Sequence, residues 1–261
     1  MSEYKEVFKR AEIKYLLNEI QYKGLMKYLE TIAAVDAYGL SKINNIYFDT
    51  PDYRLIRTSM EKPLYKEKLR LRTYGDTTDE TNSFIEIKKK YDGIVYKRRI
   101  SVKYADAFAY LTGQDAPMQD SQVAREIDAF IRFYGDMKPA MEICYDRIAM
   151  AGLDDPDFRV TFDTNIRWNV RNMDLRRKNG GRQILPPGAH LMEVKVANAI
   201  PMELSRKMSE LGIFPTSISK YGRGYADMMR LREKEVLASE KVVNFTAYKN
   251  SIIRKGAAAN G

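Results

Sequence analysis

Residues 66–72 read Lys66-Glu67-Lys68-Leu69-Arg70-Leu71-Arg72, and this alternation decides the fold. Successive side chains of a β-strand point to opposite faces. In a strand, the four cations of this stretch therefore share one face, and the two leucines share the other. We expect the leucine face to be buried in a core and the cationic face to line a second environment.

The same alternation recurs along the chain. Glu-x-Lys pairs with an aliphatic residue between them occur at residues 12–14, 86–88 and 193–195, and cations alternate at 97–99. Arg147 and Arg159 lie in two further strand-like segments. Taken together, the cations on these charged faces are Lys14, Lys68, Arg70, Arg72, Lys88, Lys97, Arg99, Arg147, Arg159 and Lys195.

The pattern of elements predicts an α+β fold. Strands are expected at about 7–14, 43–49, 64–74, 83–91, 94–103, 138–150, 157–166 and 189–197. Helices are expected at about 16–35, 52–60, 104–112, 121–134, 201–212 and 223–238. Asp92-Gly93 between two strand-like runs predicts a tight hairpin. We expect an eight-stranded antiparallel β-barrel with helices packed outside, formed by one domain over residues 1–255, and a flexible tail over 256–261.

The charged faces have two interpretations. Each one alone is typical of the solvated side of a half-buried sheet. Their recurrence in every strand, with many arginines, instead favours a shared cationic lumen. Two like charges about 8 Å apart at an effective dielectric of about 20 repel by roughly 2 kcal/mol. Ten such cations would rival the whole stability of a domain, about 5–15 kcal/mol. The lumen is therefore expected to be wet and to bind a polyvalent anion, which arginine forks and lysines suit.

Carboxylates interrupt the cationic rows at Glu12, Glu86 and Glu193. Carboxylates among phosphate-binding residues are typical of a site where Mg²⁺ or Mn²⁺ bridges carboxylate and phosphate oxygens. The alternative is that each carboxylate pairs with a neighbouring lysine or arginine. Glu193 is the preferred metal ligand of the three.

The composition limits the class of protein. The 261 residues carry 44 Lys and Arg against 35 Asp and Glu, a formal net charge of +9. This balance favours an anionic partner, whether nucleic acid, an anionic membrane surface or a phosphorylated small molecule. The single cysteine excludes an internal disulfide and fits a reducing compartment. With no signal-peptide pattern and no apolar run of about 18 residues, we expect a cytoplasmic protein, with the inner face of the membrane as a further place.

The ordered set of motifs resembles the triphosphate tunnel metalloenzymes, and within them the VTC-type polyphosphate polymerase domain. The matching segments are Glu12-Ile13-Lys14-Tyr15, Ile46-Tyr47-Phe48-Asp49-Thr50, Arg70-Leu71-Arg72-Thr73-Tyr74-Gly75, Ile85-Glu86-Ile87-Lys88, Tyr145-Asp146-Arg147-Ile148-Ala149, Arg159-Val160-Thr161-Phe162-Asp163-Thr164, Met192-Glu193-Val194-Lys195 and Ser219-Lys220-Tyr221. They follow the family order over about residues 8–225. One departure is Ser217, where the eukaryotic polymerases have a lysine.

The resemblance implies roles for individual residues. Glu193 is expected to hold the catalytic Mn²⁺ or Mg²⁺, and Arg70, Arg72 and Lys88 to act in catalysis. The resemblance implies phosphate contacts for Lys14, Arg70, Arg72, Lys88, Lys97, Arg147 and Arg159, and binding of the chain near one tunnel mouth for Ser219 and Lys220. Arg57 and Arg99 are expected as additional contacts, and Lys68 and Lys195 are expected phosphate ligands from the cationic faces. The reaction implied is transfer of the γ-phosphate of ATP to a growing polyphosphate chain.

Three other functions remain open at this point. If water replaces the chain end, the same site is a triphosphatase, which chemistry alone does not distinguish from a polymerase. A non-catalytic polyphosphate-binding module is a second alternative. A nucleic-acid platform is disfavoured because the cations alternate with aliphatic rather than stacking residues.

The sequence lacks a Gly-x-x-x-x-Gly-Lys-[Ser/Thr] loop, which excludes a P-loop enzyme. No transmembrane segment is expected, although a separate membrane partner is compatible with the sequence. His190 is expected in a loop or at a strand edge without an acid–base partner.

Overall fold

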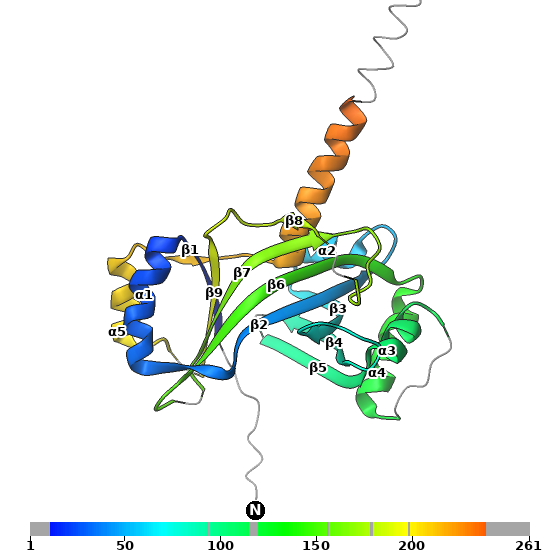
Figure 1. The fold of residues 1–261 in the computed structure, drawn as a ribbon. Helices are drawn as coiled ribbons and strands as arrows, with labels where there is room; N and C mark the ends of the chain where they lie inside the picture. Colours follow the sequence, from blue (N-terminus) through cyan, green and yellow to red (C-terminus); the bar gives the residue numbers. More distant parts are fainter. Residues whose placement is uncertain are drawn as a thin grey trace, which may run out of the picture.

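The protein, seen in a computed structural model, is an antiparallel sheet with helices on its outside (Figure 1). The structure describes residues 11–92, 94–114, 120–155, 157–177, 180–197 and 199–238. The strands are β1 (Ala11–Leu17), β2 (Ala33–Asp49), β3 (Tyr65–Tyr74), β4 (Asn82–Tyr91), β5 (Ile94–Lys103), β6 (Lys138–Gly152), β7 (Arg159–Asn169), β8 (Arg182–Gln183), β9 (His190–Val196) and β10 (Pro215–Thr216). The helices are α1 (Glu19–Ile32), α2 (Arg54–Met60), α3 (Tyr104–Leu111), α4 (Gln122–Tyr134) and α5 (Met202–Glu210), and a further helix spans 220–238.

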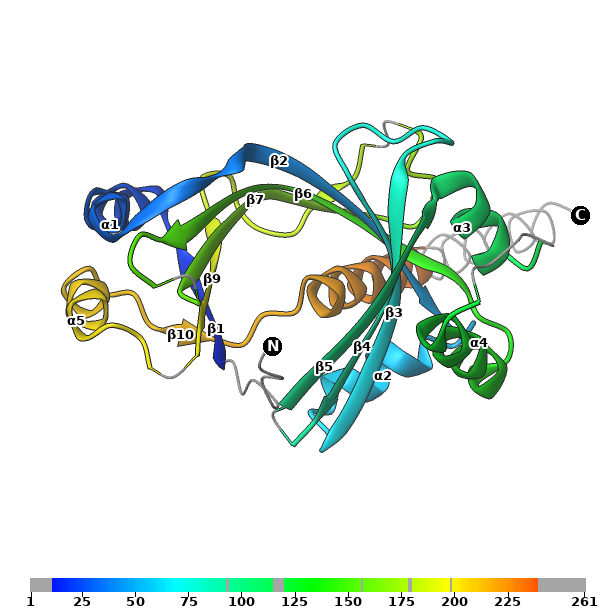
Figure 2. The ribbon, with the colours of Figure 1, turned by 90° about the horizontal axis from the view of Figure 1, so that it is seen from below.

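The sheet bends into an arch. Its strand order is β10-β1-β9-β7-β6-β2-β3-β4-β5, with β8 paired to β7 beside this path. Figure 2 shows β1 and β9 forming one arm, β3, β4 and β5 forming the other, and β2, β6 and β7 joining them. Helices α1 and α5 lie outside the first arm, and α3 and α4 lie outside the second. The helix 220–238 begins on the concave side and then projects from the body (Figures 1 and 2).

The buried apolar residues of the strands and helices form three clusters. Leu69 and Leu71 of β3, both fully buried, pack under α3 and α4 as expected from the decisive stretch. A second cluster lies under α1, where Leu25 and Leu29 are fully buried. The third cluster joins the strands at the middle of the arch to the first part of helix 220–238, from Tyr221 to Leu231. The core thus uses the outer face of the arch and one part of the inner face, and leaves the rest of the inner face polar.

Helix boundaries follow local chemistry. Asn18 accepts a hydrogen bond from the backbone N–H of Gln21, whose side chain accepts one from the N–H of Asn18, so a capping box begins α1. Asp49 ends β2 and accepts hydrogen bonds from the backbone N–H groups of Leu55 and Ile56, which begin α2. The hydroxyl of Tyr221 also donates to Asp49 (2.9 Å), so the same carboxylate fixes helix 220–238 against the sheet.

The structure corrects the expected barrel. The sheet has ten strands rather than eight, and within the described residues no backbone pairing closes it between β5 and the β10–β1 edge. The two ends of the sheet are poor partners: β10 has two residues and contains Pro215, which lacks an N–H donor, and β5 is heavily charged at its middle. The antiparallel α+β architecture itself is confirmed.

Other boundaries also differ from expectation. Helix α1 ends at Ile32 rather than 35, and β2 begins at Ala33, ten residues before the expected strand. The strands β8 and β10 were not expected. The predicted hairpin is confirmed, since Tyr91 pairs with Ile94. The tail over 256–261, and residues 7–10 of the first expected strand, fall outside the described part of the chain. None of the helices in that described part has the length and apolar character needed to cross a membrane.

Candidate functional site

A first cluster of charges on the concave face surrounds Glu86 of β4, whose side chain is 1% exposed. Its carboxylate lies 2.6 Å from Arg70 Nε, 2.5 Å from Lys97 Nζ and 3.9 Å from Arg72 Nε. The flanking strands supply these cations: Arg70 of β3 stands opposite Glu86 in the register, and Lys97 of β5 stands opposite Lys88, two residues further along β4. Burial would raise the pKa of Glu86, but these cations outweigh it and hold the pKa at about 2.

A second cluster lies on the opposite arm around Glu193 and Asp163. Glu193 contacts Lys220 (3.3 Å), Lys14 (3.4 Å) and Arg147 (3.9 Å). Asp163, fully buried, accepts two hydrogen bonds from the Arg147 guanidinium (2.6 and 2.8 Å) and contacts Lys220 at 2.5 Å. Burial alone would raise the pKa of Glu193, but Lys220, Lys14 and Arg147 hold it well below its ordinary value. Two buried carboxylates thus share two cations.

Glu12 of β1 connects the two clusters across the open side of the sheet. Its carboxylate lies 3.5 Å from Lys14 on its own strand, 4.0 Å from Lys195 of β9 and 3.8 Å from Lys88 of β4. The contact with Lys88 joins the two arms of the arch through side chains where no backbone pairing does so. Burial raises the pKa of Glu12, but the lysines outweigh it, so the pKa lies below its ordinary value.

Uncharged side chains on the same face orient the arginines. Asn45 Oδ1 accepts a hydrogen bond from Arg72 Nε (2.8 Å), and the Tyr145 hydroxyl accepts one from Arg72 Nη2 (3.3 Å). The Tyr47 hydroxyl accepts one from Arg70 Nη1 (3.4 Å). Our sequence interpretation missed Asn45 and Tyr47 as site residues. The sequence shows that they share one face of β2 by period two, whereas their place opposite Arg72 and Arg70 is set by the register between β2 and β3.

The structure brings most of the expected site residues together. The ion-pair network contains Lys14, Arg70, Arg72, Lys88, Lys97, Arg147, Lys195, Lys220, Glu12, Glu86 and Glu193. Lys68 joins it at one end by donating to the Ser219 hydroxyl (3.0 Å). Asp163 is the network member that sequence reasoning missed.

Three expected phosphate ligands lie at its margin. Arg57 is on α2 and pairs with Asp52 (3.0 Å), with more than half of its side chain exposed. Arg99 lies over the Phe84 ring, 4.8 Å from its centroid. Arg159 is exposed and stands opposite Lys195 in the register. Their role as phosphate ligands stays a prediction.

The carboxylates differ in how well they suit a metal ion. Among the described residues, no three His, Cys, Asp or Glu side chains gather closely enough to hold a metal alone. Mg²⁺ in phosphate-processing sites, however, needs only one or two carboxylates, because phosphates and water supply the other oxygens. Glu193 and Glu12 fit this requirement, since they lie on paired strands and share Lys14. All three carboxylates contact three cations, but Glu86 lies 2.5 Å from Lys97 and 2.6 Å from Arg70, whereas the cations of Glu193 and Glu12 lie 3.3 Å away or farther, and this closer pairing favours the ion-pair role for Glu86.

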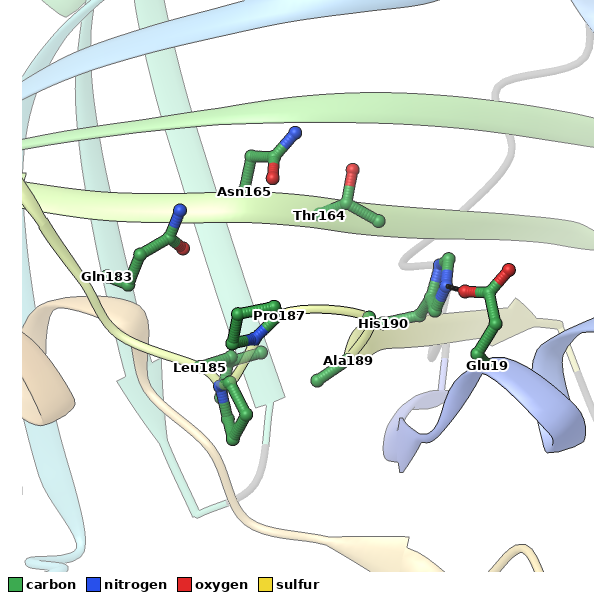
Figure 3. A pocket seen from close by; sticks show the side chains of 10 residues that line it. Glu19, Thr164, Asn165, Gln183, Leu185, Pro187, Ala189 and His190 are labelled. Atoms are coloured by element: carbon green, nitrogen blue, oxygen red, sulfur yellow. Dashed lines mark hydrogen bonds and ion pairs between the residues drawn. The ribbon is translucent and has the colours of Figure 1, made fainter.

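A separate pocket of about 190 Å³ lies beside the start of α1, and Figure 3 shows the side chains that line it. His190 Nε2 lies 2.8 Å from Glu19 Oε2, and the imidazole stacks on Tyr22 of α1. His190 is the first residue of β9, as expected for a strand edge, but the expectation that it lacks an acid–base partner is wrong. The partner comes from α1, 171 residues away in the sequence. His190 points away from Glu193, because they are three residues apart on one strand.

Comparisons with known proteins agree with this architecture. The sequence pattern of the VTC domain matches residues 9–229. A candidate adenylyl cyclase from Hippeastrum, described as having a dominant triphosphatase activity, superposes with a TM-score of 0.51 at 14% identity, over 83% of this chain and 95% of that chain. A candidate adenylate cyclase from Bacillus halodurans gives a TM-score of 0.49 at 14% identity, over 80% of this chain and 92% of that one. No curated protein matches the sequence. The Hippeastrum similarity shows a shared fold.

Proposed function

The chain belongs to the VTC domain family, and on this premise we propose that it is an ATP-dependent polyphosphate polymerase that uses a divalent metal ion. The observation that carries the proposal is the ion-pair network on the concave face, where more cations than carboxylates converge from both arms. Buried or half-buried cations in excess repel one another, and a polyvalent anion removes that repulsion. Linked phosphates suit the site because arginine forks and lysine point charges alternate there.

The proposed reaction needs no covalent protein intermediate. Phosphoryl transfer is accelerated mainly by positioning and by neutralising charge on the transferring group. Arg70 and Arg72, held by Glu86 and Asn45, would bind the phosphate oxygens from one arm. Arg147, held by Asp163, would bind them from the other arm. Carboxylates that fix the guanidinium groups thus keep them in place before the substrate arrives.

The atoms balance without a further reactant. A terminal oxygen of the polyphosphate chain attacks the γ-phosphorus of ATP and forms the new P–O bond. The bond between the γ-phosphorus and the β,γ-bridging oxygen breaks, and ADP leaves with the electron pair. The chain is then one phosphate longer. A bound Mg²⁺ or Mn²⁺ would neutralise charge on the phosphate oxygens, and Glu193 with Glu12 would hold it.

One incubation tests the reaction. Purified protein with ATP and Mn²⁺ or Mg²⁺ should produce ADP and long-chain polyphosphate. Production of orthophosphate alone would support a metal-dependent inorganic or nucleoside triphosphatase, which the described activity of the Hippeastrum protein of the same fold favours as the second candidate. Retention of triphosphate without any turnover would instead support a non-catalytic polyphosphate-binding module.

Two variants test the division of roles. Glu193→Gln should abolish turnover and retain triphosphate binding, because the site loses a metal ligand and keeps its cations. Arg70→Ala should weaken triphosphate binding itself, by roughly 1.5–3 kcal/mol for a lost charged hydrogen bond. Isothermal titration with tripolyphosphate in EDTA, beside an ATPase assay with metal, measures both quantities. An equal loss of binding in the two variants would contradict the division.

The proposal also carries an expected location. ATP supply and the single cysteine fit the cytoplasm. A separate membrane partner would hold the protein at the inner face of the membrane, and cell fractionation with and without such a partner would test this.

A further inference from the structure

The balance of charge changes along β3 and β4. At Arg70 and Arg72 the neighbouring strand supplies the Glu86 carboxylate. Two residues closer to the β4–β5 hairpin, Lys68 stands opposite Lys88, and one further step places Lys66 opposite Lys90. Like charges directly opposite in a sheet destabilise it. The hairpin end of this face therefore lacks the compensation that the inner part has.

The contacts of these lysines are with neutral groups. Lys66 Nζ donates to the backbone carbonyl of Ser59 (3.5 Å), and Lys68 Nζ donates to the Ser219 hydroxyl (3.0 Å). Within the described residues, the ion pairs of β3 and β4 involve Arg70, Arg72, Glu86 and Lys88, but neither the two outermost lysines, Lys66 and Lys90, nor Lys68 between them and the lumen. Burial, together with Lys90 and Lys62, lowers the pKa of Lys66. Burial lowers the pKa of Lys68 to about 8.

We propose that Lys66 and Lys90 form an outer binding site for a phosphate chain, which continues the cationic row beyond the lumen and selects chains longer than a triphosphate. This inference rests on the proposed function and deepens it. The occupant is a chain of linked phosphates that extends past the hairpin end of β3 and β4, whether it enters as acceptor or leaves as product.

The length of the row supports a long chain. Arg72 and Lys66 are six residues apart, so their strand positions are separated by about 20 Å at 3.3 Å per residue. An extended phosphate chain advances by two P–O bonds per unit, a distance comparable to the rise of one strand residue, about 3.3 Å. The row therefore spans about six phosphate units, whereas a triphosphate reaches only the inner half. A site for triphosphate alone would not need cations at its outer end.

The faces of the side chains favour a phosphate chain over a nucleic acid. Tyr65 and Tyr91, opposite each other in the register, alternate with Lys66 and Lys90 and so lie on the other face of the sheet. On the face of the outer lysines, the aromatic residues of these two strands are Phe84 and Tyr74, which lie at the other end of the row, so these strands place no ring next to Lys66 and Lys90. Binding of nucleic acid single strands depends on such rings. The same absence disfavours an adenine site there.

The test compares two anions with one double variant. Lys66→Gln with Lys90→Gln removes two charges from the outer site, and Lys27→Gln with Lys89→Gln removes two from the outside of α1 and the other face of β4. Binding of tripolyphosphate and of long-chain inorganic polyphosphate is measured by titration in EDTA, so that turnover plays no part, over a series of salt concentrations. Each lost phosphate contact lowers the slope of log K against log salt by about 0.7 for a single-stranded polyanion.

For long-chain polyphosphate, the slope of log K against log salt should be smaller in magnitude by about 1.4 in the outer-site variant than in the wild type. If the two plots meet at 1 M salt, this difference corresponds to about a 25-fold loss of affinity at 0.1 M salt. The tripolyphosphate affinity of this variant should match that of the wild type, which also shows that the variant folds. The control variant should bind both anions as the wild type does. Equal losses for both anions, no loss for the long chain, or the same loss in the control would overturn the outer site while leaving the lumen intact. Failure of the wild type to bind either anion would instead overturn the proposed function.

Discussion

Glu86→Gln tests whether the cationic lumen is held in shape by its carboxylates. The substitution keeps the size of the side chain and removes the charge that faces Arg70, Lys97 and Arg72. With Glu86 almost fully buried, solvent screens these contacts little. The pKa of Glu86 falls from its ordinary value of 4.5 to about 2 in the folded protein. At about 1.4 kcal/mol per pH unit, this difference corresponds to about 3 kcal/mol of stabilisation of the ionised carboxylate. Breaking a buried ion pair by removing one partner costs a similar amount, about 3–5 kcal/mol.

The expected result at pH 7 is a loss of about 3 kcal/mol in the free energy of unfolding, or roughly 6–12 °C in Tm for a chain of this size. The sign of the pH dependence follows from the lowered pKa of Glu86. The contribution is complete above pH 4.5 and is lost as pH falls through about 2, because the unfolded state then binds the proton more readily. The difference between wild type and variant should therefore shrink to about 1.4 kcal/mol at pH 3.

Urea unfolding followed by circular dichroism at pH 7, 5 and 3 measures these differences. Glu30→Gln, at an exposed position of α1, is the matched control and should change stability by less than 0.5 kcal/mol. Saturating tripolyphosphate should narrow the Glu86→Gln deficit, because the anion replaces the missing negative charge. A deficit under 0.5 kcal/mol at pH 7, or one of equal size at pH 7 and pH 3, would refute the reasoning.

Further predictions concern the second cluster, the lysines and the metal. Asp163→Asn removes the closer of the two carboxylates that Arg147 and Lys220 share and leaves them only Glu193, so urea unfolding should show a loss of about 3–5 kcal/mol; a loss under 1 kcal/mol would count against the pairing. Burial lowers the pKa of Lys68 and of Lys97 to about 8, so tripolyphosphate affinity should fall as pH rises through about 8 and these lysines lose their charge. Replacing both with arginine should move that fall to higher pH, and an unmoved fall would contradict the assignment. EDTA should abolish turnover while tripolyphosphate stays bound in a titration; joint loss of both would argue against metal-independent binding by the cations.

The strands β3, β4 and β5 of one arm were predictable because the rule of alternation marks them. Cations alternate with leucines over residues 68–72, and charged residues alternate with isoleucines over 85–88, although 88–90 and 97–99 are runs of consecutive cations. The expected bounds of the three strands agree with the structure within a residue. The rule works there because one face packs under α3 and α4 while the other faces the ion-pair network. The hairpin between β4 and β5 was specified locally by Asp92-Gly93.

The first half of β2 was not predictable by this rule. Ala33 and Ala34 continue the helical composition of α1, and the strand that follows contains Gly39, which adopts a positive φ of 56°. The register shifts between Val35 and Leu40, so no strict alternation exists. This segment is a strand because it pairs with the end of β6, a tertiary contact about 115 residues away that no local window contains.

The sequence predicted which residues line the candidate site better than it predicted which of them pair with each other. Side chains alternate with period two along β7, so Arg159, Thr161 and Asp163 lie on one face. The rule that identified Arg159 could therefore also have identified Asp163 as a site residue. The partner of each carboxylate was not available, because it depends on the register between strands. Glu86 meets Arg70 only because β3 and β4 pair in one register, and a shift by one residue would send its side chain to the other face.

The open sheet is compatible with an enclosed anion because side chains close the gap that backbone pairing leaves. Glu12 reaches Lys88 from the facing arm at 3.8 Å, and Lys68 reaches Ser219 at 3.0 Å. Both contacts end in groups that prefer a phosphate to their present partner, because the half-exposed Lys88 gains little from a surface ion pair and the partly buried Lys68 gains little from a hydroxyl. We therefore expect the closure to open for a chain and to reform on it, which a fully hydrogen-bonded barrel would resist. Glu12→Gln tests this, because it removes the Lys88 contact and leaves the lysines. It should speed tripolyphosphate association in EDTA, measured by stopped flow, and an unchanged rate would show that Glu12 does not gate the gap.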